Sequence, residues 1–124
     1  MSQRGFSLVE ALIAVAIIGI AISAIAPAFF VQMDANTRNE ERTEAAAAAA
    51  LVMERLRYED PSKMPDSGAS DPRKITVGKR VYEAVVTFCA IPEYCGPGSR
   101  HVRTEVSLDD NVLYTIETVY SSMQ

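Results

Sequence analysis

The chain has 124 residues, a formal net charge of −4 at pH 7 and no tryptophan. This length allows one small domain beside a tether. The acidic balance argues against nucleic acid as the main partner, and two cysteines with one histidine are too few for a zinc site, which takes about four ligands.

A basic leader opens the chain, and a long apolar run follows it. Residues 1–5 carry one charge, Arg4, and Glu10 is the last charged residue before residues 11–31. About 21 uncharged residues would form a helix about 31 Å long, which matches the hydrocarbon core of a bilayer. We therefore expect a membrane-spanning helix at this point.

Glu10 is unusual beside such a run, because a carboxylate there costs up to about 3 kcal/mol. If the chain were cut after Gly5, Phe6 would gain a free α-amine one helical turn before Glu10. The carboxylate could then pair with this amine in its own chain or in a neighbouring copy, and it also complements the helix dipole. The alternative is a carboxylate that snorkels to the lipid headgroups.

A seven-residue motif here resembles the N-terminal signature of type IV prepilins and pseudopilins: Arg4-Gly5-Phe6-Ser7-Leu8-Val9-Glu10. The resemblance implies cleavage between Gly5 and Phe6 by a prepilin peptidase, methylation of the Phe6 amine, and Glu10 as the carboxylate that guides assembly. It implies that Pro27 bends the helix. Other pilin subunits and the inner-membrane assembly machinery are the implied partners, and no cofactor is implied.

Two other readings of the N-terminus are open. An ordinary secretory signal peptide would be cut after Ala24-Ile25-Ala26, although Glu10 and the following Pro27 argue against it. A plain, uncleaved membrane anchor is the second alternative.

The helical pattern continues beyond the apolar run. Residues 34–58 contain no glycine or proline, and residues 45–50 are all alanine. Apolar residues at helical spacing form one stripe: Ala45, Ala49, Val52, Met53 and Leu56. We expect one helix of about 50 residues, with a transmembrane and assembly part at 6–31 and an amphipathic part at 32–59. Pro27 should bend or locally unwind it.

Residues 60–73 are rich in proline, serine and aspartate and predict a solvated, mobile loop. Residues 74–124 alternate with period two, and four strands are expected, at 74–77, 81–91, 102–108 and 112–120. Turns are expected at residues 78–79 and 109–111. Short connections favour an antiparallel sheet of three to four strands, packed on the alanine-rich helix in an α+β fold.

Cys89 and Cys95 predict one disulfide in an exported chain, worth roughly 2 kcal/mol by loop closure. A Cys/His nucleophile pair with His101 is the alternative, but no orienting third group is evident, and we expect His101 to be an exposed strand residue. No phosphate-binding loop or nucleophile elbow is present, which favours a protein that is not an enzyme.

Basic residues that could form a patch for DNA, if their strands adjoin, are Lys79, Arg80, Arg100 and Arg103. Solvated strand charges are the simpler interpretation.

Together these features predict a minor pilin of a type IV pilus or related filament. It would be single-pass in the inner membrane and then part of a pilus, at the periplasm or cell surface. A pseudopilin of a type II secretion system is the first alternative. A membrane-tethered or secreted binding module that never polymerises is the second.

Overall fold

The computed structural model describes residues 5–122 and shows one long helix followed by a five-stranded sheet. The helix, α1, is Leu8–Arg57, and two 3-10 helices, η1 and η2, are Pro61–Lys63 and Pro92–Tyr94. The strands are β1 (Gly68–Ala69), β2 (Arg73–Val77), β3 (Arg80–Phe88), β4 (Ser99–Leu108) and β5 (Asn111–Ser121). The chain divides into two compact units, residues 1–38 and 39–124, and α1 begins in the first and ends in the second.

The predicted α+β class is confirmed, with five strands in place of three to four. All pairings are antiparallel in the order β1-β3-β4-β5, and β2 also pairs with β3. Because β4 occupies one edge of β3, β1 and β2 follow one another along the other edge. The added strand β1 has only two residues, too few for a period-two signal in the sequence.

Both predicted hairpin turns form where the chain must adopt positive φ. Gly78 has φ 61° between β2 and β3, and Asp109 and Asp110 have φ 49° and 65° between β4 and β5. In the turn between β4 and β5 both central residues thus have positive φ. This is the geometry of a type I′ turn, which matches the right-handed twist of the strands. Aspartate tolerates this conformation better than most residues.

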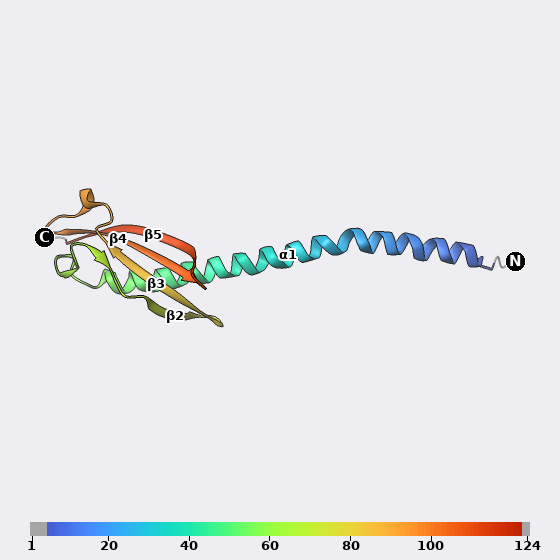
Figure 1. The fold of residues 1–124 in the computed structure, drawn as a ribbon, viewed down its shortest axis with the longest axis horizontal. Coiled ribbons are helices and arrows are strands. Elements are labelled where there is room, and N and C mark those ends of the chain that lie inside the picture. The colour runs from blue at the N-terminus through green and yellow to red at the C-terminus, as the bar shows by residue number, and fades with distance from the viewer. Residues whose placement is uncertain (1–4, 123–124) are drawn as a thin grey trace. The chain divides into compact units, whose positions relative to one another are not determined.

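The core lies between the second half of α1 and one face of the sheet (Figure 1). The predicted helix stripe is buried, and Ala48 joins it. On β3 the alternating residues predicted to share a face are all buried: Tyr82, Ala84, Val86 and Phe88. Val102 and Val106 of β4 complete this layer.

The proline in α1 does not interrupt the helix. α1 continues through Pro27, so the local unwinding expected there does not occur, and the bend stays a prediction. The segment expected to be a plain loop, 60–73, contains η1, β1 and the first residue of β2. Asp60 starts η1 by accepting a hydrogen bond of 3.0 Å from the Ser62 N–H, and Met64 is buried against the core.

The expectation that His101 is exposed was wrong, because its side chain is buried. It lies on β4 next to the loop that carries η2. The Tyr94 ring centroid is 6.2 Å from the His101 ring, and the His101 N–H points to Cys95 Sγ at 3.3 Å. Strand alternation placed His101 on the solvent side, but it could not reveal that the disulfide loop folds over that position.

Candidate functional site

The N-terminal motif forms the start of α1. The first helical hydrogen bond runs from the Ala11 N–H to the Ser7 carbonyl at 3.1 Å, so Ser7 occupies the position that precedes the helix. Glu10 is the acidic residue of the first turn, where a negative charge complements the helix dipole. The Phe6 side chain is exposed. Arg4 lies outside the described residues.

The apolar run forms an exposed helical surface. The exposed large apolar side chains from Leu8 to Met33 have exposed fractions between 56% and 77%, and no side chain in this stretch is buried. An 18-residue window of α1 has a mean hydropathy of 2.6. Helix α1 is therefore long and apolar enough to cross a membrane.

The comparisons with known proteins bear on this same segment. Residues 1–26 match the family model of the prokaryotic N-terminal methylation motif. The chain carries a type IV prepilin-like signature. No curated protein and no solved structure matches the chain. The match supports a pilin-like or pseudopilin-like substrate of prepilin peptidase, with pilin subunits as partners and a structural role in place of an enzymatic one. The signature also fits membrane anchoring followed by assembly.

The two cysteines form the predicted disulfide, Cys89–Cys95. The two cysteines are six positions apart in sequence, and the loop that they close follows β3 and contains η2. Because both sulfur atoms are bonded to each other, the alternative of a Cys/His nucleophile pair with His101 has no free thiol. Within residues 5–122, no group of three or more potential metal ligands comes together.

The three arginines of the expected basic patch, Arg80, Arg100 and Arg103, each contact carboxylate or carbonyl oxygens of the chain. Arg103 Nε lies 2.5 Å from Glu117 Oε1, and His101 Nε2 lies 3.4 Å from Glu117 Oε2. These contacts, the hydrogen bond from Arg103 first, lower the pKa of Glu117. Arg100 is buried, and it contacts Asp66 and the Gly96 carbonyl. The strands do not bring Arg80 beside Arg100, because Arg80 pairs with Val77 at the far end of β3.

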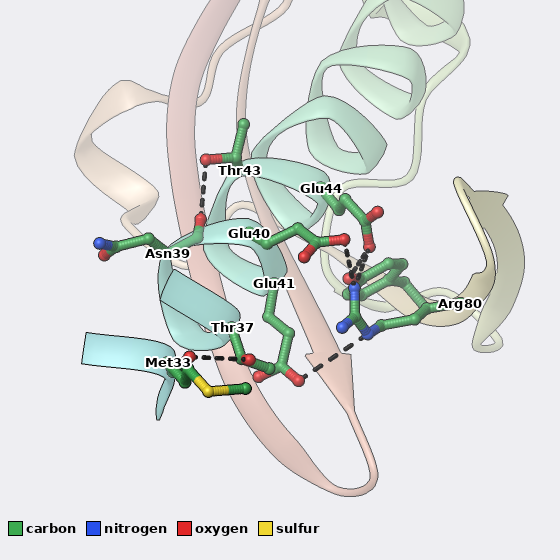
Figure 2. Close-up of polar contacts among 9 residues, drawn as sticks. Met33, Thr37, Asn39, Glu40, Glu41, Thr43, Glu44 and Arg80 are labelled. Atoms are coloured by element: carbon green, nitrogen blue, oxygen red, sulfur yellow. Dashed lines mark hydrogen bonds and ion pairs between the residues drawn. The ribbon is translucent and has the colours of Figure 1, made fainter. Parts of the chain in front are cut away.

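A polar cluster that sequence reasoning missed joins α1 to the β2–β3 hairpin. Figure 2 shows Glu40, Glu41 and Glu44 of α1 directed toward Arg80. Arg80 Nη1 lies 3.1 Å from Glu44 Oε2 and 3.2 Å from Glu40 Oε1. The buried Tyr82 hydroxyl donates to Glu44 Oε2 at 2.6 Å. We call Glu44, Arg80 and Tyr82 the polar latch.

The latch shifts the pKa of all three groups. The hydrogen bond from Tyr82, and then the contact with Arg80, lower the pKa of Glu44. Burial, and then the hydrogen bond to Glu44, raise the pKa of Tyr82 to about 12. The carboxylates raise the pKa of Arg80. A sequence signal existed, since Glu40 and Glu44 are four residues apart and border the buried stripe, but their partner is far away in sequence.

Proposed function

We propose that this chain is a minor pilin, a structural subunit of a type IV pilus or related filament. Residues 1–5 are its leader, and cleavage between Gly5 and Phe6 frees an amine that is then methylated. Residues 6–31 span the inner membrane and later pack in the filament. Residues 32–57 continue the helix, residues 58–67 connect it to the sheet, and the sheet in residues 68–121 faces outward.

One observation carries the proposal: a methylation motif matches residues 1–26, and its only carboxylate lies in the first turn of an exposed apolar helix. In a filament, Glu10 of one copy would neutralise the Phe6 amine of the next and set their axial register. The unpaired carboxylate is costly in an apolar bundle, so the pairing favours correctly stacked subunits. Pro27 supplies the bend with which the helix leaves the bilayer.

The test is the mature N-terminus of the protein from its native host, read by mass spectrometry. The proposal predicts a chain that begins at a methylated Phe6. A chain that begins at Pro27 would identify a secretory signal peptide, and one that keeps residues 1–5 while functioning would identify a plain anchor. Either result would overturn the proposal.

A variant at Glu10 separates filament assembly from membrane insertion. Glu10→Ala should insert in the membrane normally but be lost from sheared filaments, because the amine of the next copy then has no partner. Asp34→Ala is the matched control, since it removes an exposed carboxylate further along α1 whose partner, Arg38, is in the same helix at 3.1 Å. If Glu10→Ala assembled as well as Asp34→Ala, the chain would be a tether that does not polymerise.

A further inference from the structure

The last strand, β5, has a free edge with unusually little protection. Among residues 5–122 it pairs only with β4, and it has eleven residues without glycine, proline, lysine or arginine. Its single charge, Glu117, is held by Arg103. Natural proteins usually protect such an edge with charges, prolines or short strands, because its free backbone groups can pair with another strand.

The apolar side chains of β5 are also incompletely covered. On β4 the core-facing residues Val102 and Val106 are fully buried, whereas Tyr114 and Ile116, opposite this strand on β5, are only partly buried. A strand added beside β5 would cover them further.

The backbone pattern identifies the free groups of β5. Ser122 donates to the Gly98 carbonyl, and the pairs of β4 and β5 keep one register from Ser99–Ser121 to Val106–Tyr114. Because hydrogen-bonded pairs alternate in an antiparallel ladder, the even-numbered residues of β5 bond to β4. The N–H and C=O groups of Thr115, Glu117 and Val119 therefore point outward.

The opposite edge of the sheet is complementary. Val77 pairs with Arg80 across the two-residue turn, so Arg73, Ile75 and Val77 bond to β3, and the backbone groups of Lys74 and Thr76 point outward. With β2, β3, β4 and β5 alternating in direction, β2 and β5 run opposite ways. If a second copy lies beside the first in the same orientation, β2 of the second copy is therefore antiparallel to β5 of the first copy.

In one register, the side chains of β5 in the first copy and of β2 in the second copy are complementary on both faces of the sheet. With Ile75 of the second copy opposite Ile116, Val77 falls opposite Tyr114, and both pairs join partly buried apolar side chains on the core face. On the outer face, Lys74 then falls opposite Glu117 and Thr76 opposite Thr115. The outward backbone groups coincide in this register, and cross-strand apolar and opposite-charge pairs stabilise a sheet.

We propose that β5 of one copy binds β2 of a second copy of this chain in this register, which extends the sheet across the two subunits. Successive copies would lie about 19 Å apart, four strand spacings, which leaves room for a helix of about 10–12 Å on each. Because sheets twist, repeated addition gives a helical array in place of a flat one. The inference rests on the proposed function, since subunits that gather in one membrane meet their own copies.

The test is disulfide crosslinking of the full chain in membranes of its native host. Thr76→Cys and Thr115→Cys are placed in the same chain, both at exposed positions. Two strands separate these positions, about 14 Å, so they cannot bridge within one chain, where the Cα atoms must lie within about 7 Å. We expect a ladder of linked chains on a non-reducing gel after mild oxidation.

Matched variants define the register. The pair Thr76→Cys with Val119→Cys keeps the same strand and face but moves one position by four residues, and it should give about tenfold less product, because disulfide geometry is narrow. Within the first pair, Lys74→Glu should weaken the ladder by placing like charges opposite each other. Lys79→Glu, the same charge change at the turn, should not.

The outcomes separate this inference from the proposed function. No ladder from processed, methylated chains would overturn the sheet contact and leave the pilin proposal intact. A dimer from Thr115→Cys alone would place β5 against its own copy and would also overturn it. A ladder formed by chains that keep residues 1–5 would support the contact and contradict the pilin proposal.

Discussion

Glu44 shows how one side chain ties two parts of the fold together. The fully buried Tyr82 carries a hydroxyl that needs a partner inside the core, and the nearest acceptor is the Glu44 carboxylate on α1. Arg80 on the other side keeps this carboxylate charged. The turn leaves room for it as well, since a Cβ at Gly78 would lie 2.4 Å from Glu44 Oε1. The latch thus fixes the β2–β3 hairpin to the helix.

The latch predicts a loss of stability in acid. Its contacts lower the pKa of Glu44 below the ordinary value of 4.5, so the folded state binds this proton less readily than the unfolded state. The contribution of Glu44 is therefore complete above the unfolded pKa and is lost as pH falls through the folded pKa. Thermal melts of the full chain in detergent should show Glu44→Gln less stable than wild type at pH 7, with a smaller decline below about pH 4.5.

Glu54→Gln is the control for this measurement, because it removes an exposed glutamate from the same helix outside the latch. Its melting temperature should follow the wild-type pH profile. Glu117, whose pKa Arg103 also lowers, adds to the acid decline in every variant equally. Coincident profiles for Glu44→Gln and wild type would show that the latch does not stabilise the fold.

At the scale of elements, the alanines of α1 set how closely the helix approaches the sheet. Ala45, Ala48 and Ala49 are fully buried, whereas Ala47 and Ala50 are exposed. Within this tract, alanines on one face of the helix therefore pack on the sheet, and alanines on the other face are exposed to solvent. Buried alanine leaves no side chain that could yield, so the distance between helix and sheet is fixed by backbone contact.

The buried and exposed faces predict different effects of the same substitution on stability. Ala48→Leu inserts three carbons into a closed contact and should lower the free energy of unfolding by about 1–3 kcal/mol. Ala47→Leu makes the same change on the exposed face and should be nearly neutral, because leucine and alanine are both good helix formers. Denaturant unfolding followed by circular dichroism measures both. Equal losses would mean that the alanine tract is not packed on one face.

The elements were predictable where a periodic signal was present. The helix stripe, four strands and both hairpin turns follow from residue spacing and turn residues. The disulfide pairing follows because the chain has only two cysteines. The strand β1, the burial of His101 and the latch were not predictable. Each depends on contacts between segments far apart in sequence, such as Glu44 with Tyr82 or His101 with the disulfide loop, and a single sequence contains no record of such distances.

The N-terminal signature was the clearest signal in the sequence, for a physical reason, while the roles of its residues stay predictions. Its signal is local: the Gly5-Phe6 pair, a carboxylate one turn later and an uncharged run all lie within about thirty consecutive residues. No tertiary contact is needed to interpret it. The sheet surface offered no comparable signal, and the complementarity of β2 and β5 became visible only once the ladder register was known.

At the scale of the whole molecule, the chain separates into a part without a core and a part with one. Every buried side chain among residues 5–122 lies at or after Ala45. The latch, the disulfide and the core cluster all belong to the unit of residues 39–124. The exposed apolar surface of α1 from Leu8 to Met33 is therefore available for packing against lipid or other proteins.

This division predicts that residues 39–124, exported to an oxidising compartment, fold without the rest of the chain. The fragment keeps the helix stripe from Ala45 to Leu56, the three residues of the polar latch and the two other glutamates near Arg80, Glu40 and Glu41. Its melting temperature should lie within about 5 °C of the full chain in detergent, because less than about 1 kcal/mol of native contact is removed. A fragment that starts at residue 51 loses Ala45, Ala48 and Ala49 and should show no cooperative transition. If the 39–124 fragment also unfolded without cooperativity, the first half of α1 would be contributing to the fold, and the separation into anchor and head would be wrong.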